Sequence, residues 1–356
     1  MKFTNHIRKL AAWLCAVVAL PALLTSCDGV LYEDEGDCEV IYRVKFRYDW
    51  NMKFADAFAN EVKSVKLYAF DMDGKLVWQT SESGEALAAD DYSIVLPLKP
   101  GNYRLAAWCG LDNGESFTVP EIDKGDAHEQ IHCRLNRLYE NGAAYSKDDL
   151  HPLFHGIIDV TLPDAELEGG EFVYTLPLKK DTNVFRITLQ HLSGEHLNKR
   201  DFTFRIEDSN GWMHHTNELR DDEPLEYRPW VQYEGSAGVE TGAPRPDGSR
   251  AIENVRVVIA ELTVSRLVMR DWSVYSKPML VIRRADDGKL IARVPIIDYA
   301  LLVKGAANMN MDDQEFLDRN DVYNMTFFLD HDLRWLSTVI NIHTWRVVKN
   351  RTELES

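Results

Sequence analysis

The alternation of apolar and polar side chains is the feature that most restricts how this chain can fold. From Cys38 to Tyr48 every second residue is apolar, and the positions between them include one glutamate and three basic residues. Successive side chains of a β-strand point to opposite faces of a sheet. This pattern therefore predicts a strand that is buried on one face only.

The same habit continues along the chain, whereas sustained helical periodicity is confined to short segments near residues 56–61 and 312–319. Turn-forming runs such as Asp71-Met72-Asp73-Gly74 separate the alternating segments. The sequence therefore predicts an all-β fold. The expected strands are 38–48, 62–70, 75–78, 92–98, 103–108, 157–162, 174–178, 184–192, 202–206, 255–267, 279–283, 323–329 and 339–348.

The length of the chain favours two domains. With 356 residues it exceeds the ~250–300 residues at which a single core stops growing. Turn residues cluster between 163 and 171, in the middle of the chain. We therefore predict two β-sandwich domains, residues 38–175 and 176–356. The stretch 234–250, rich in Gly, Ser and Pro, is expected to be an exposed loop.

Residues 1–26 have the layout of a secretory signal peptide. Lys2, Arg8 and Lys9 precede an apolar stretch from Leu10 to Leu24. That stretch holds about 15 residues, fewer than the ~20 that a membrane-spanning helix needs. A removable signal is therefore predicted, and a lasting transmembrane helix is not.

Residues 24–27, Leu-Thr-Ser-Cys, resemble the lipobox of bacterial lipoproteins, in which the cysteine is acylated and becomes the first mature residue. Cys27 is the predicted lipidation site. Several acyl chains, at ~0.8 kcal/mol for each buried methylene, would make the anchor effectively permanent. The alternative is an ordinary signal, with Cys27 as an incidental thiol. Residues 27–37 carry five acidic residues and no basic one, which predicts a solvated tether.

The overall charge and the motifs present narrow the function. The formal net charge of −17 argues against a nucleic-acid partner. No nucleophile elbow, phosphate-binding loop or dinucleotide fingerprint occurs. The sequence therefore predicts a binding protein without catalytic activity or cofactor. Cys38, Cys109 and Cys133 would permit one disulfide in an oxidising compartment, and the pair is left open.

Residues 128–132 spell H-E-x-x-H, a zinc-protease signature. The motif needs a helix, which brings the two histidines to within ~6 Å, whereas a strand separates them by ~13 Å. The alternation that follows favours a solvated strand face, so no metal site is expected. Zinc hydrolysis through His128 and His132 stays a remote alternative.

The aromatic residues leave one further alternative, a surface adhesin or glycan-binding lipoprotein. Exposed Trp212, Trp230 or Trp272 would support it, because exposed rings stack on sugars. The tryptophans within or beside strand patterns are expected in the core. These are Trp50, Trp78, Trp108, Trp335 and Trp345.

Several segments together resemble the FimB/Mfa-type (fimbrillin-like) family of fimbrial anchor lipoproteins of Bacteroides-type bacteria. The resemblance covers nearly all of the chain after the signal, and its specificity comes from the number and order of the segments. The segments are 48–58 (YDWNMKFADAF), 67–71 (LYAFD), 106–111 (AAWCGL), 181–184 (DTNV), 314–319 (QEFLDR) and 323–330 (YNMTFFLD).

The resemblance implies two transthyretin-like β-sandwich domains, an outer-membrane lipid anchor and a place at the base of a surface fimbria. It also implies strand exchange with a fimbrial stalk subunit, in which main-chain hydrogen bonds supply affinity. In related stalk subunits an arginine-specific protease removes an amino-terminal strand. Here no lysine or arginine lies between Cys27 and Arg43, so we expect this segment to survive and the first strand to stay in place. Residues 339–348 are expected to meet the first stalk subunit. By analogy with other lipoproteins of these bacteria, the acidic residues after Cys27 suggest export to the cell surface.

Overall fold

The computed structural model describes residues 40–111, 114–164, 170–241, 251–337, 339–342 and 345–348. The all-β prediction is confirmed, because strands dominate these ranges. The described residues between 42 and 164 and between 172 and 348 fall into one compact unit, and the described residues outside that unit are Val40, Ile41, Gly170 and Glu171. No helix within the described ranges is long and apolar enough to cross a membrane.

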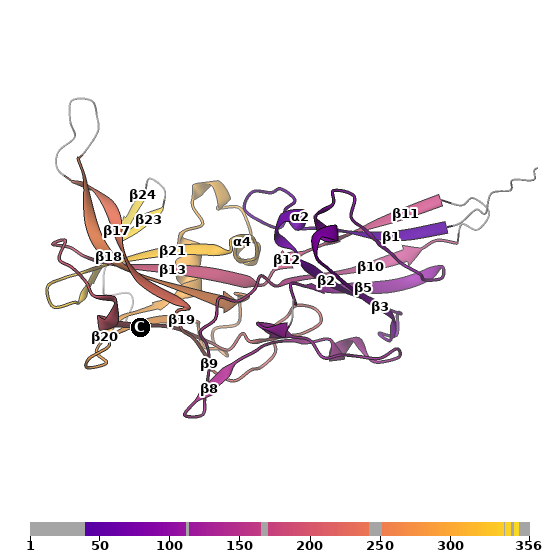
Figure 1. The fold of residues 1–356 in the computed structure, drawn as a ribbon, viewed down its shortest axis with the longest axis horizontal. Coiled ribbons are helices and arrows are strands. Elements are labelled where there is room, and N and C mark those ends of the chain that lie inside the picture. Colours follow the sequence, from indigo (N-terminus) through magenta and orange to yellow (C-terminus); the bar gives the residue numbers. More distant parts are fainter. Residues whose placement is uncertain are drawn as a thin grey trace, which may run out of the picture. The chain divides into compact units, whose positions relative to one another are not determined.

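The first half of the chain builds two sheets (Figure 1). The predicted alternation is confirmed in β1, where Tyr42, Val44 and Phe46 are buried while Lys45 and Arg47 are exposed. The three-stranded sheet has the order β11 (Gly170–Pro177), β1 (Val40–Arg47), β4 (Ile94–Val95). The five-stranded sheet has the order β12 (Lys179–Lys180), β10 (Phe154–Leu162), β5 (Gly101–Cys109), β2 (Ser64–Phe70), β3 (Leu76–Ser83).

Two larger sheets are built mainly from the second half. One has the order β17 (Val231–Thr241), β18 (Ala251–Ser265), β13 (Thr182–His191), β21 (Val322–Leu329), β22 (Trp335–Ser337). The other has the order β20 (Leu290–Pro295), β19 (Met279–Arg284), β14 (Phe202–Asp208), β16 (Leu225–Tyr227), β9 (Ala143–Ser146), β8 (Leu138–Glu140). Strand β13 pairs in parallel with β21 and antiparallel with β18. Its side chains Phe185, Ile187 and Leu189 are fully buried.

A segment of the first half crosses into these later sheets. Strand β9 pairs in parallel with β16, and β8 pairs with β9. In a small sheet, β7 (Cys133–Leu135) lies between β6 (Phe117–Thr118) and β15 (Trp212–Met213). Pairing between these distant strands was not predicted from the sequence. The domain boundary at residue 175 stays a prediction.

Short helices connect the strands. The predicted helices are confirmed as α2 (Phe58–Glu61) and α4 (Asp313–Arg319). Helix α3 (Ile296–Leu302) was missed, because four of its seven residues are buried and its sequence lacks a clear polar face. Single 3₁₀ turns occur at η1 (Glu85–Ala88), η3 (His128–Gln130), η4 (Lys199–Asp201) and η5 (Ala306–Asn308).

Two predicted elements differ from the structure. Part of the expected loop 234–250 belongs to β17, which pairs with β18 along its whole length. Gly235 fits in this strand because a Cβ atom there would lie only 3.1 Å from Ile259 Cδ1. The glycine that favoured a loop in the sequence instead permits close packing against the neighbouring strand. The expected strand 339–348 is instead a hairpin of β23 (Val339–Ile342) and β24 (Trp345–Val348), which pair with each other.

Two glycines with the same backbone angle provide a test of packing at the end of β5. Gly110 and Gly142 both have φ +84°, but a Cβ on Gly110 would lie 1.9 Å from the carbonyl oxygen of Pro152, whereas one on Gly142 would meet no atom within 4 Å. We expect Gly142→Ala to lower the free energy of unfolding by about 1–2 kcal/mol, through backbone strain alone. Gly110→Ala should cost about 2 kcal/mol more through the added clash. Urea unfolding of both variants checks this, and equal losses would contradict it.

Candidate functional site

The first strand is secured on both of its edges. Strand β1 lies between β11 and β4 in the sheet order, with Arg43 opposite Val95. Leu96 N donates a hydrogen bond to Tyr42 O at 2.8 Å, and Leu178 N donates one to Arg47 O at 2.8 Å. Its buried face adds apolar packing. Removing this strand would therefore expose core residues and break hydrogen bonds to both neighbours.

The residues that follow β1 fold back and present an aromatic surface to α4. Asp56 Oδ1 accepts a hydrogen bond from Tyr48 N at 3.0 Å. Arg319 of α4 donates from Nη1 to Asp49 O at 3.0 Å, and its guanidinium lies 4.1 Å from the centre of the Trp50 ring. A cation over an indole face is attracted by the negative potential of the ring. Helix α4 is therefore tied to the chain immediately after the first strand.

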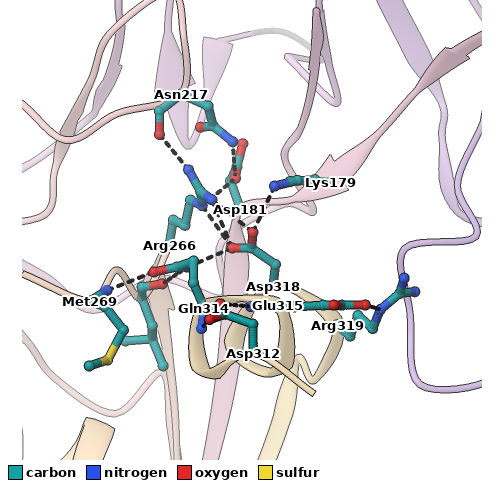
Figure 2. Close-up of polar contacts among 11 residues, drawn as sticks. Lys179, Asp181, Asn217, Arg266, Met269, Asp312, Gln314, Glu315, Asp318 and Arg319 are labelled. Atoms are coloured by element: carbon teal, nitrogen blue, oxygen red, sulfur yellow. Dashed lines mark hydrogen bonds and ion pairs between the residues drawn. The ribbon is translucent and has the colours of Figure 1, made fainter. Parts of the chain in front are cut away.

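The residue beside Arg319 belongs to a buried ion cluster (Figure 2). Asp318 Oδ1 accepts a hydrogen bond from Arg266 Nη2 at 2.8 Å, and its Oδ2 accepts one from Lys179 Nζ at 2.9 Å. The Asp318 side chain is only 1% exposed, and Asp181 Oδ1 lies 3.6 Å from Arg266 Nε. We call Lys179, Asp181, Arg266 and Asp318 the ion cluster. It joins β12, the end of β18 and α4.

Neutral groups donate further hydrogen bonds to the ion cluster. Gln314 Nε2 donates to Asp318 Oδ1 at 2.8 Å, and Asn217 Nδ2 donates to Asp181 Oδ1 at 2.8 Å. The Asp312 side chain caps α4 by accepting hydrogen bonds from the first-turn backbone, as Figure 2 also shows. Such satisfaction is what a buried charge requires, because an unpaired one is costly.

The two carboxylates of the ion cluster differ in their surroundings. Burial is the main reason that the pKa of Asp181 is raised to about 7, and the negative charge of Asp318 adds to the effect. Arg266 and the hydrogen bond from Asn217 act in the opposite direction. Asp181 Oδ2 has no hydrogen-bond partner among the described residues. The Asp181 carboxyl is therefore protonated more readily than an exposed aspartate.

The cysteine predictions fall partly outside the described residues. Cys27 and Cys38 are both outside them, so lipidation and a disulfide to Cys38 stay predictions. Cys109 and Cys133 are free and fully buried. Burial raises the pKa of both thiols, which keeps them protonated and unreactive.

The H-E-x-x-H residues do not lie on a strand face as expected. His128 begins the single turn η3, and the strand β7 starts only at Cys133. The His128 ring packs 4.1 Å from that of buried His215, while the His132 ring meets Trp212 at 5.4 Å. The local apolar alternation extended the expected strand too far, because the chain turns at Ile131. Within the described ranges, the group of His, Cys, Asp and Glu side chains close enough to share a metal ion includes neither His128 nor His132.

The tryptophan side chains are not buried and exposed as the sequence predicted. Trp108 is fully buried, whereas Trp50, Trp78 and Trp335 are half-buried and Trp345 lies outside the residues whose side chains are described. Trp212 is covered by the guanidinium groups of Arg134 at 3.8 Å and Arg220 at 4.6 Å. Trp272 is half-buried against the core, and Trp230 is 37% exposed. Of the three rings named for sugar stacking, Trp230 offers the most open surface.

Sequence reasoning missed the ion cluster, although two of its members lie in the family-like segments 181–184 and 314–319. Arg266 could have indicated a buried charge, because it interrupts an apolar run near the end of β18. In the structure it is only 8% exposed. Charged residues are rarely buried without a partner. The sequence does not reveal, however, which opposite charges more than fifty residues away would meet it.

The family described as fimbrillin-A associated anchor proteins Mfa1 and Mfa2 matches residues 34–351. The minor fimbrium anchoring subunit Mfa2 of Porphyromonas gingivalis is 29% identical over 208 residues, which cover 58% of this chain. The match spans only 61% of that curated relative.

Solved structures are also similar. A candidate adhesin from Bacteroides thetaiotaomicron has a TM-score of 0.73 at 33% identity, covering 88% of this chain and 98% of its own. A candidate polysaccharide-binding protein from the same organism has a TM-score of 0.71 at 27% identity, covering 88% and 99%. The fimbrial anchor protein Mfa2 of P. gingivalis has a TM-score of 0.62 at 18% identity, covering 88% and 100%, which supports the fold alone.

Loss of a carboxylate from the ion cluster should lower the free energy of unfolding far more than loss of a carboxylate from an exposed ion pair. Asp318→Ala leaves Arg266 buried with its main partner removed, so we expect the free energy of unfolding to fall by about 3–5 kcal/mol. Asp159→Ala removes an equally bidentate partner of Arg104, at 2.7 and 2.9 Å, but that carboxylate is 55% exposed. Its loss should cost less than about 1 kcal/mol. Denaturant titration of both variants measures the difference, and similar losses would show that the cluster is not held by charge pairing.

Proposed function

Because the chain belongs to the family of fimbrillin-A associated anchor proteins, we propose that it attaches a fimbria to the outer membrane through a lipid on Cys27. In this role the protein holds the fimbria at the membrane and catalyses no reaction. The family assignment supports a place in the cell envelope. The lipobox supports the lipid anchor.

The observation that carries the proposal is the way the first strand is fixed. Strand β1 follows the acidic tether directly, and it is bonded to a neighbour on each edge. After β1, the backbone of Asp49 and the ring of Trp50 contact Arg319 on α4. The preceding residue of that helix, Asp318, belongs to the ion cluster. Force applied to the tether would therefore be transmitted through β1 to buried contacts in the second half of the chain. An anchor needs such a connection.

The same arrangement would protect the anchor from the protease that matures the stalk. Arg43 is the first basic residue after Cys27, and it lies inside β1 opposite Val95. Proteolysis requires a segment to leave its sheet and enter the protease in extended form. The lipid-bearing tether would therefore remain attached while stalk subunits lose their first strand.

We place the contact with the first stalk subunit at the hairpin of β23 and β24. These strands pair with each other and not with the larger sheets of the described residues. A strand from a neighbouring subunit could add to such a hairpin, or the hairpin could open and enter a groove of that subunit. Strand exchange of either kind would join the anchor to the stalk.

A surface adhesin is the second candidate function. The candidate adhesin from B. thetaiotaomicron is 33% identical to this chain, and the candidate polysaccharide-binding protein is 27% identical. Exposed Trp230 supplies one aromatic surface for a glycan. This role is compatible with a lipid anchor but needs no fimbrial partner.

A pull-down from native membranes separates these roles. We expect wild type to recover fimbrillin-like subunits, Cys27→Ala to be shed into the medium, and Glu35→Gln, a neighbouring tether substitution, to behave as wild type. Deleting residues 339–356 should leave the protein on the membrane but without stalk subunits, as mass spectrometry of the recovered material would show. If wild type recovers no fimbrial subunit, the adhesin function is favoured.

The protection of the tether can be tested with one added basic residue. Glu35→Arg creates an arginine within the acidic tether, outside the strand. We expect an arginine-specific protease to release this variant from membranes, while wild type and Glu35→Gln are retained. Immunoblotting of the supernatant measures release. Equal release of wild type would mean that Arg43 is accessible, and it would contradict the proposed protection.

A further inference from the structure

Two histidines and a glutamate meet at the end of β13. His191 is the last residue of that strand and is only 2% exposed. Glu195 lies in the loop that follows, and His331 lies in the turn between β21 and β22. One possible metal-ligand atom from each of the three lies within 4.8 Å of the other two. We call these residues the histidine site.

The spacing within the histidine site is close to that of a metal centre. Glu195 Oε2 lies 3.7 Å from His191 Nε2, and Glu195 Oε1 lies 3.7 Å from His331 Nδ1. Ligands of a tetrahedral zinc ion at ~2.0–2.2 Å lie about 3.4 Å from one another. The three ligand atoms lie within 4.8 Å of one another, so the exposed side chains of Glu195 and His331 would have to move closer to His191 to complete a tetrahedral site.

The buried histidine is already oriented. Ser193 Oγ lies 2.7 Å from His191 Nδ1, and Ser193 N also donates to that nitrogen at 3.2 Å. The backbone N–H can only donate, so in this arrangement Nδ1 accepts and the proton of the neutral ring lies on Nε2, facing Glu195. A metal at Nε2 therefore requires the ring proton to move to Nδ1, where Ser193 Oγ can accept a hydrogen bond from it once the contact with Ser193 N is released. A hydrogen bond donated by the second ring nitrogen is one that metal-binding histidines ordinarily make.

The backbone holds the two histidines close without a metal. His191 pairs with Leu329 of β21, and Leu192 N donates to Leu329 O at 3.0 Å. Asp330 closes the turn that carries His331, because its Oδ1 accepts hydrogen bonds from Asp332 N at 2.9 Å and Arg334 N at 2.7 Å. Ligands held this way lose little conformational freedom on binding.

From this geometry we propose that the histidine site binds one divalent cation of the zinc class, with an open position for water or for a donor from another molecule. Imidazole nitrogen favours zinc and its neighbours in the first transition series, whereas calcium takes six to eight oxygen ligands. The bound ion would join β13 to the turn that leads into β22. It would thus fix the base of the segment from which the carboxy-terminal hairpin extends. The proposal is independent of the fimbrial role.

Calorimetric titration of the full-length chain, purified in detergent without a histidine tag, tests the proposal with ZnCl2. We expect one saturable equivalent, no displacement by CaCl2, and an affinity at least about ten-fold lower in His331→Gln. His331 is 78% exposed at its side chain, so this variant should fold normally. X-ray absorption at the zinc edge should show nitrogen and oxygen ligands. Zinc should also raise the Tm of wild type but not that of His331→Gln.

Two control variants separate this site from the other histidines. His196 lies in the same loop but pairs with Glu234 at 2.9 Å, so His196→Gln should bind zinc as wild type does. His128→Gln removes the H-E-x-x-H motif and should also leave binding unchanged. The proposal is overturned if zinc does not bind, if His331→Gln binds it with wild-type affinity, or if His128→Gln abolishes binding instead.

Discussion

Arg266 and Asp318 are buried together, and each is the main charged partner of the other. Each loses its hydration on folding, and direct hydrogen bonds of about 3 Å replace the lost water. The pair ties α4 to the end of β18, because Asp318 lies on α4 and Arg266 follows β18. It also fixes β12, because Lys179 completes the coordination of the same carboxylate. The arrangement around the first strand depends on that fixed helix.

Helix α4 uses consecutive residues for two different tasks. Asp318 points into the ion cluster, while Arg319 reaches the backbone of Asp49 and the ring of Trp50. Neighbouring side chains on a helix diverge by about 100°, so one short helix can contact two regions of the chain. A seven-residue helix is weak by itself. Here the tertiary contacts, and not helix propensity, account for its presence.

What the sequence predicted follows from local periodicity. The alternation in 38–48 foretold which side chains of β1 are buried, and the helical segment predicted near 312–319 was confirmed as α4. The alternation could not foretell which strands pair, so the joining of β9 to β16 was missed. The histidine site shows the same limit, because His191 and His331 are brought together by β-sheet pairing. The two histidines of H-E-x-x-H, four residues apart, were easy to see in the sequence, but their rings pack against different side chains.

The position of β1 between two partners determines how the molecule would respond to mechanical load. Tension applied along a strand that is bonded on both edges acts in shear, so many hydrogen bonds must break at once. A strand at the edge of a sheet that is pulled sideways instead peels open one bond at a time, at lower force. Because Tyr42 and Arg47 accept hydrogen bonds from different neighbours, the rupture force of β1 would be shared by two separate parts of the chain. The mechanical strength of this attachment would then depend on the geometry of the strand as well as on its thermodynamic stability.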